Sequence, residues 1–346
     1  MADEMPSPKI VSITDASEAV GGVEPNAEEK PEGYYASICP GKSTRLDPKF
    51  CEAVLALQTA LGRPVWLLIQ HQAEEQFGEL DETLARTFLL RRKQLPEEPI
   101  ALLIDSLGGR SRSAFQIAKL LRQACGDYVS VVPRIAKSAA TLLALGGSKL
   151  YMSPHAELGP LDSQVFDDPD RGWHSTLDDV QALDRLHAFA LEASDRNMFM
   201  FIRRTGKKID TLLPISLEFV SDLMRPLFEK IDAIHYSEFS RVLKEGEEYT
   251  IRLLRQRFTQ EQAEQIARRL VMNYPDHGFV IDPEEAADMG LGPETTVPEL
   301  TGMFDALLRY AGKQNIIGEL RPLPRKETKN EELQQKRRAG YEQGKR

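Results

Sequence analysis

A serine set among small residues is the strongest candidate for chemistry in this chain. Ser138 lies in the sequence IAKSAAT, directly after the β-rich run YVSVV, and it opens an apolar stretch that favours a helix. A helix N-terminus favours negative charge, so it would assist a serine alkoxide or the oxyanion formed when that serine attacks a carbonyl. The alternative is that Ser138 only caps the helix. The two roles are compatible.

A glycine pair follows another apolar run. Gly108 and Gly109 end the sequence DSLGG, which comes directly after PIALLI and before a predicted helix. Glycines there allow a sharp turn whose bare N–H groups could hold a developing oxyanion or a phosphate at a helix N-terminus. The chain contains neither G-x-G-x-x-G nor G-K-[ST], which argues against the phosphate. A simple turn is the third interpretation.

An aspartate and a histidine could complete a hydrolytic site. Asp162 ends the sequence ELGPLD, and His277 lies in YPDHG, between proline and glycine. Histidines in loops are more available as bases than those on apolar helix faces. The plainer interpretations are a local hydrogen-bonding aspartate in a turn and a surface histidine.

Metal and cofactor chemistry is not predicted. The chain has no H-E-x-x-H, no paired-histidine spacing and no C-x-x-C among its three cysteines, Cys39, Cys51 and Cys125. We therefore expect no metal, no cofactor and no disulfide framework, which suits a reducing compartment.

The elements that must position these residues alternate along the first half of the chain. Apolar runs predict strands at 64–69, 99–104, 128–132 and 150–152, and apolar periodicity predicts helices at 48–61, 81–95, 111–125 and 139–145. This alternation is typical of an α/β fold with a parallel sheet and crossover helices. The second half is predicted to be helical at 177–204, 216–243 and 259–271, with a break at Pro226 and a capping box at Thr259 and Gln262. A last short helix is predicted within 281–291.

The composition of the chain argues against some classes of function. The 346 residues include 44 basic and 53 acidic ones, a net charge of -9, which argues against broad nucleic-acid binding. No run of about 18 apolar residues and no secretory pattern is found, so we expect a soluble, cytoplasmic protein without membrane contact. Residues 1–32 are predicted to be a disordered acidic tail and residues 321–346 a disordered basic tail, around one domain at 33–320.

Together these motifs resemble one family. The segments IDSLGGRSRSAFQIAKLLR and VVPRIAKSAATLLALGGSKLYMSPHAELGPLDSQV look like the ClpP/crotonase-like fold of the Clp proteolytic subunit and of signal peptide peptidase A. The closest resemblance is to the serine dehydrogenase proteinase family, a ClpP-related branch of serine peptidases. That family pairs a serine in a small-residue motif with an L-G-P-[IVL]-D-x-Q turn, and it has a histidine before an E-A-x-x-x-G-L helix. The corresponding sequences here are LGPLDSQ and EEAADMGL.

The resemblance implies a serine peptidase that cleaves peptides or proteins. Its site would consist of Ser138, Asp162 and His277, in that chain order, with an oxyanion hole from the backbone of Gly108, Gly109 and Ala139. It also implies a homo-oligomer, whose contacts could come from PVWLLIQ and from the helices after residue 177. The sequence departs from the Clp pattern at Leu107, where a proline is usual, and at Lys137, where a small residue is usual.

Three questions stay open at the level of sequence. A Ser–Lys dyad would need a lysine from elsewhere, because Lys137 is adjacent to the serine and should point away from it; Lys207 and Lys208 are distant alternatives. The chain could instead be a catalytically inactive ClpP/crotonase-like scaffold or binding module. A crotonase-type acyl-CoA enzyme is the third possibility, since a glycine-based oxyanion hole also stabilises an enolate.

Overall fold

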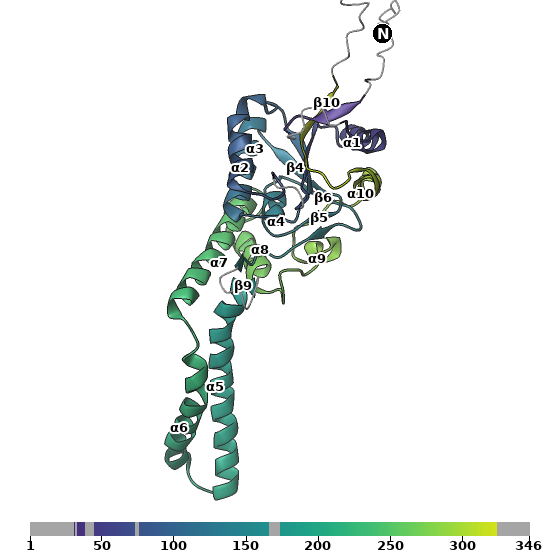
Figure 1. Cartoon of the computed structure of the whole chain (residues 1–346). Coiled ribbons are helices and arrows are strands. Elements are labelled where there is room, and N and C mark those ends of the chain that lie inside the picture. Colours follow the sequence, from purple (N-terminus) through teal and green to yellow (C-terminus); the bar gives the residue numbers. More distant parts are fainter. Residues whose placement is uncertain (1–30, 32, 39–44, 73–75, 166–173, 324–346) are drawn as a thin grey trace, which may run out of the picture.

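A six-stranded sheet lies at the centre of the protein. The computed structural model describes residues 31, 33–38, 45–72, 76–165 and 174–323 (Figure 1). The strand order is β1-β10-β2-β3-β4-β6. Four neighbouring strands are parallel: β2 (Val65–Ile69), β3 (Ile100–Asp105), β4 (Tyr128–Val132) and β6 (Leu150–Met152). At the other edge, β10 (Ile316–Pro322) runs antiparallel to both β2 and β1 (Tyr34–Ala36). The predicted α/β class is confirmed.

Helices cover both faces of this sheet, which explains the unbroken apolar sequences of its central strands. Every residue of β2, β3 and β4 is buried. Leu67 and Leu103 on one face belong to the core formed with α1 (Pro48–Leu61) and α10 (Glu299–Tyr310). Leu68 and Leu102 on the other face join the core formed with α2 (Glu82–Leu90), α3 (Ser111–Cys125) and α4 (Ala139–Leu145), and Figure 1 shows the two layers on opposite sides.

Helix caps fix several boundaries as predicted. Helix α1 begins at Pro48 because the Asp47 carboxylate accepts a hydrogen bond from the N–H of Lys49 at 2.8 Å, and it ends at the left-handed Gly62. Helix α8 (Gln260–Met272) has the predicted capping box between Thr259 and Gln262.

A helical hairpin projects from the rest of the molecule (Figure 1). We call α5 (Thr176–Thr205) and α6 (Ile209–Phe228) the arm; α7 (Ala233–Leu254) leads back to the body, which is everything else. The helical stretch predicted at 216–243 has its predicted break, but the break lies at 229–232 rather than at Pro226, and the two helices extend beyond the predicted bounds. Pro226 lies inside the last turn of α6, where its fixed φ is compatible with a helix that ends two residues later. The Asp232 side chain then caps the start of α7.

Other predicted boundaries shift. The helix expected at 81–95 ends at Leu90 and is followed by a 3₁₀ turn, Arg92–Gln94. Strand β10 extends to Pro322, two residues into the segment predicted as the basic tail. The rest of that tail, nearly all of residues 1–32 and Cys39 lie outside the described residues. Across the described ranges, the helices lack the combination of length and apolarity needed to cross a bilayer.

Candidate active site

Ser138 has a strained backbone at the junction between a strand and a helix. It follows the short strand β5 (Ile135–Ala136) and precedes α4, with φ 50° and ψ -126°. An L-residue with positive φ costs about 1–3 kcal/mol and persists only where its surroundings enforce it, most often at functional sites. Ser138 occupies the N-cap position of α4, as one interpretation predicted, but its side chain makes no capping hydrogen bond there.

Two glycines allow neighbouring segments to reach Ser138. A Cβ atom at Gly108 would lie 2.5 Å from the Lys137 carbonyl oxygen and 2.9 Å from the Ser138 Cβ. A Cβ atom at Gly159 would lie 3.3 Å from the Ser138 nitrogen. The DSLGG turn and the ELGPLD segment therefore pack directly against the serine, and both approaches depend on the absence of a side chain.

Of the three backbone N–H groups predicted to form the oxyanion hole, one is already hydrogen-bonded and two have no partner within the described ranges. The Gly108 N–H donates a hydrogen bond to the Ser106 hydroxyl at 3.0 Å. The N–H groups of Gly109 and Ala139 donate none to any other residue that the structure describes. Unpaired backbone donors in segments that pack against a serine could bind an oxyanion.

A buried amide that the sequence analysis missed supports the glycine turn. Gln70, at the end of β2, donates through Nε2 to the Phe77 carbonyl at 2.8 Å and accepts from the Ser106 hydroxyl at 2.7 Å. Ser106 in turn holds the Gly108 N–H. A polar residue at the end of an otherwise apolar strand was the available signal, because a buried amide needs hydrogen-bond partners.

An ion pair between a buried carboxylate and a partly exposed arginine links the end of β3 to the segment that follows β4. Arg134 contacts both carboxylate oxygens of Asp105, with the shortest distance 2.9 Å. Burial raises the pKa of Asp105, and the hydrogen bond from Arg134 opposes that rise. The pair joins Asp105, the first residue of DSLGG, to the segment that leads into Ser138.

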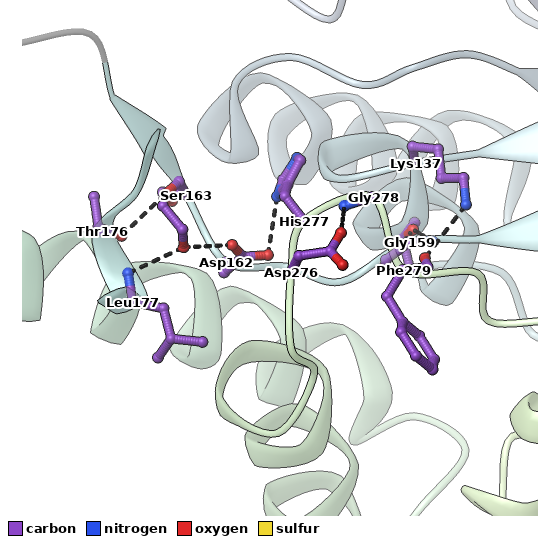
Figure 2. Close-up of polar contacts among 12 residues, drawn as sticks. Lys137, Gly159, Asp162, Ser163, Thr176, Leu177, Asp276, His277, Gly278 and Phe279 are labelled. Carbon is purple, nitrogen blue, oxygen red and sulfur yellow. Dashed lines mark hydrogen bonds and ion pairs between the residues drawn. The ribbon is translucent and has the colours of Figure 1, made fainter. Parts of the chain in front are cut away.

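Asp162 and His277 meet although 115 residues separate them. His277 Nδ1 lies 2.9 Å from Asp162 Oδ1, and the Asp162 side chain is only 3% exposed (Figure 2). The interpretation of Asp162 as a local turn residue is therefore wrong, since its partners come from distant segments. An Nδ1–H that donates to the carboxylate leaves Nε2 as the lone-pair nitrogen.

A second hydroxyl, also missed from the sequence, holds the other carboxylate oxygen. Ser175 Oγ donates to Asp162 Oδ2 at 2.5 Å, and it accepts from the N–H of Leu177 at 3.1 Å as the N-cap of α5 (Figure 2). Asp162 is thus fixed from both sides: by the imidazole and by the first residue before the arm.

The segments that carry the serine and the histidine are linked through Lys137 and the Phe279 carbonyl, 3.4 Å apart, but the two side chains share no direct bond. In the part of the chain that the structure describes, no hydrogen bond joins the Ser138 hydroxyl to the His277 ring, and His277 Nε2 makes none. Such contacts are often long in unliganded hydrolases and tighten when substrate binds. Nε2 is the nitrogen available to a nucleophile.

The lysines do not form a Ser–Lys pair. The Lys137 ammonium is occupied by Glu157 and two backbone carbonyls, one of them that of Phe279 (Figure 2), and among the described residues it makes no hydrogen bond to the Ser138 hydroxyl. Lys207 and Lys208 lie in the turn between α5 and α6, at the end of the arm far from the body (Figure 1). Among the described residues, no group of three histidine, cysteine or acidic side chains could hold a metal ion.

The fold and these contacts define an α/β protein with a serine at a strained strand–helix junction. Residues 67–187 match the model of the family described as ClpP-like SDH-type serine proteinase. The match confirms the resemblance predicted from the sequence and supports a peptidase-type function. It includes Ser138 and Asp162 and ends before His277.

Two curated proteins and a solved structure are also similar to parts of the chain, at 15–25% sequence identity. Two uncharacterized proteins of Methanocaldococcus jannaschii, MJ0137 and MJ1495, are 25% and 24% identical over 67% and 69% of this chain. The matches span 66% and 64% of those proteins' own lengths. ClpP1 from Listeria monocytogenes aligns over 69% of this chain and 93% of its own, with 15% identity and a TM-score of 0.33.

Proposed function

We propose that the chain is a serine peptidase whose nucleophile is Ser138. The observation that carries the proposal is the His277–Asp162 pair, which lies on chain segments that pack against the segment of a strained serine. This is the base-and-orienter arrangement that activates a hydroxyl, and its chain order is free. Peptides or proteins are the proposed substrates.

The chemistry follows from the roles of these groups. Ser138 Oγ attacks the scissile carbonyl carbon while His277 Nε2 takes the hydroxyl proton. Asp162 orients the imidazole and stabilises its charged form. The collapsing tetrahedral intermediate expels the amine, which receives that proton from His277, and water then repeats the sequence on the acyl-enzyme.

The oxyanion would bind to the N–H groups of Gly109 and Ala139. Loss of one such donor generally raises the barrier by about 3 kcal/mol. The Gly108 N–H already donates to the Ser106 hydroxyl. We therefore propose that Gly108 allows the turn to form and does not donate a hydrogen bond to the substrate.

The test is labelling by a fluorophosphonate probe, with peptide mapping of the labelled site. The wild-type protein should be labelled at Ser138, and Ser138→Ala should not be labelled. His277→Ala should lower the labelling rate by about 10²-fold or more. Ser148→Ala, which removes a hydroxyl bound to Asp127 outside the site, is the matched control and should label normally. Absence of wild-type labelling, or labelling that survives Ser138→Ala, would reject the proposal.

Two alternatives have distinct outcomes in the same experiment. An inactive scaffold is favoured by the missing Ser138–His277 hydrogen bond, and it predicts no labelling of folded protein. A crotonase-type acyl-CoA enzyme predicts thioester turnover that survives Ser138→Ala.

We also infer that the chain forms a homo-oligomer through its arm. In α6 the buried apolar residues form a single row at four-residue spacing, Leu212, Val220 and Met224, with Ser216 between them. Large apolar side chains flank that row on both sides and are exposed: Leu213, Ile215, Leu217, Phe219, Leu223 and Leu227. A helix that is apolar over so much of its circumference is normally covered.

A second copy fits this surface better than a bilayer does. Helices that lie on membranes carry a polar face rich in lysine and arginine, whereas α6 has three acidic residues and one basic residue. Light scattering should give a multiple of the 38.9 kDa chain mass. A monomer at micromolar concentration would reject the inference.

A further inference from the structure

Lys137 joins the serine segment to the histidine loop. Its Nζ lies 2.9 Å from Glu157 Oε2, 3.1 Å from the Leu158 carbonyl oxygen and 3.4 Å from the Phe279 carbonyl oxygen. An ammonium group has three donors, so these three acceptors match its capacity. Phe279 is two residues after His277, and Lys137 is the residue before Ser138.

The aliphatic part of the Lys137 side chain packs closely against Gly159. A Cβ atom at Gly159 would lie 2.8 Å from the Lys137 Cδ and 3.2 Å from its Cα, so only glycine leaves room for the stem. The Lys137 side chain is 14% exposed. Its backbone is fixed as well, because its N–H donates to the Ser106 carbonyl at 3.0 Å.

The histidine loop needs such an anchor. Between α8 and Ile281 the chain is irregular, and Asp276, Gly278 and Val280 are exposed. The loop is tied at its end by the paired backbones of Ile281 and Leu158, with N···O distances of 2.8 and 3.1 Å. Leu158 belongs to β7 (Glu157–Leu158), and Lys137 binds the same Leu158 carbonyl and extends the tie to Phe279 (Figure 2).

We propose that Lys137 is a positioning residue that sets the distance between the Ser138 hydroxyl and His277 by holding the Phe279 carbonyl from the serine's own segment. The proposal rests on the proposed peptidase function. It also gives a physical reason for a lysine at a position where the Clp pattern has a small residue. A shift of about 1 Å in a reacting group can lower a rate by about 10²-fold, and an unanchored loop would allow such a shift.

The substitutions separate a positioning role from that of a general base. Lys137→Met keeps the length of the stem and removes the donors. Lys137→Arg restores donors for carbonyls and for Glu157, but a guanidinium cannot accept the serine proton. Lys149→Met is the control, because Lys149 also ties a strand to a loop, through Glu294 at 4.0 Å, away from the site.

The first measurement is the rate of fluorophosphonate labelling against probe concentration. We expect Lys137→Met to lower the saturating rate by about 10²-fold with little change in the half-saturating concentration. Lys137→Arg should recover most of that rate, with an unchanged pH profile, and Lys149→Met should match wild type. If Lys137→Met labels at the wild-type rate, the proposal fails. If Lys137→Arg is as slow as Lys137→Met while His277→Ala labels normally, Lys137 is the base and the proposal also fails.

The second measurement does not depend on activity. Amide hydrogen exchange at residues 276–280 should speed up in Lys137→Met and stay unchanged in Lys149→Met. Unlabelled wild-type protein would reject the peptidase function, and unchanged exchange in Lys137→Met would reject the tie itself. If Lys137→Met fails to fold, Glu157→Gln provides a milder test, because it weakens one contact of Lys137 and keeps both carbonyl contacts. Compared with Lys137→Met, Glu157→Gln should show a smaller rise in amide exchange and a smaller fall in the labelling rate.

Discussion

The body and the arm use similar apolar residues in opposite ways. In the body, β2, β3 and β4 bury every side chain against helices of the same chain. In the arm, the 30-residue helix α5 buries only Thr176 and Leu177, at the end that joins the body, and exposes residues such as Phe189 and Phe199. The body packs its strands into a core that fixes the neighbouring site residues, whereas the arm exposes apolar side chains that its own helices do not cover.

The largest predicted difference in activity is between two glycine-to-alanine variants, one in the body and one in the arm. Gly108→Ala would place a Cβ atom 2.5 Å from a backbone oxygen and against Ser138, so the turn must move. We expect a loss of about 10²-fold or more in activity and about 1–3 kcal/mol in the free energy of unfolding. Gly206→Ala, at the end of α5, has φ +66° and no atoms within 4 Å.

The arm glycine is the matched control. Gly206→Ala should cost about 1–2 kcal/mol from the left-handed backbone alone, without any effect on catalysis. Labelling kinetics and chemical denaturation of both variants measure this. Equal losses of activity in the two variants would contradict the division into a body that fixes the site and an arm that does not.

The next prediction concerns the joint between the regions. Ser175→Ala removes the donor to Asp162 Oδ2 together with the cap of α5. A hydrogen bond to a charged group contributes about 1.5–3 kcal/mol, so activity should fall about tenfold or more, and Ser175→Thr should restore it. Thr259→Ala removes a cap of similar strength from α8, about 1 kcal/mol, and should leave activity unchanged. Similar activity in both alanine variants would show that Ser175 only caps the helix.

A pair of adjacent positions in α6 tests the arm. Phe219→Ser changes an exposed side chain and should shift the stability of the monomer by no more than about 0.5 kcal/mol, while lowering the mass seen by light scattering. Val220→Ser, one residue on, lies in the buried row, and it should destabilise the arm. If Phe219→Ser leaves the assembly intact, another surface forms the contact.

The smallest predicted effect is an acid-side loss of stability near the histidine loop. The Glu285 carboxylate accepts hydrogen bonds from the Tyr274 hydroxyl at 2.6 Å and from Arg269 at 2.7 Å, and these, Tyr274 first, hold its pKa below the usual 4.5. A carboxyl group with a lowered pKa in the folded state adds stability above pH 4.5, and that stability is lost as the pH falls through the folded-state pKa.

Glu285→Gln isolates this contribution. The variant should be less stable than wild type at neutral pH by about 1 kcal/mol or less, and the difference should shrink as the pH falls below 4.5. Thermal unfolding at a series of pH values measures it. A difference that does not change with pH would mean that the carboxylate charge contributes nothing.

The sequence predicted best what local pattern controls. Helix α1 and strand β4 have their predicted bounds because a cap and a glycine mark the first and a mainly apolar, β-branched run marks the second. Family motifs pointed to Ser138, Asp162 and His277, and the structure brings the last two into contact. The roles of these residues stay predictions, as does a cytoplasmic location.

Long-range pairing explains most of what was missed. Strand β10 has a glycine, Gly318, near its start and polar residues after it, and its pairing with β2 and β1, both far away in sequence, makes it a strand. Ser175 resembles any serine that caps a helix, and its second bond to Asp162 depends on the fold. Local periodicity contains no information about either contact.

The position of β10 also has a consequence for synthesis of the protein on the ribosome. β10 lies between β1 and β2, and within the described ranges β10 is the strand that pairs with β1. The edge of β2 therefore stays unpaired until residues 316–322 leave the exit tunnel, after the whole apolar hairpin has been made. Since unpaired strand edges and exposed apolar helices both promote aggregation, nascent chains that stop before residue 316 should be the form that depends most on chaperones.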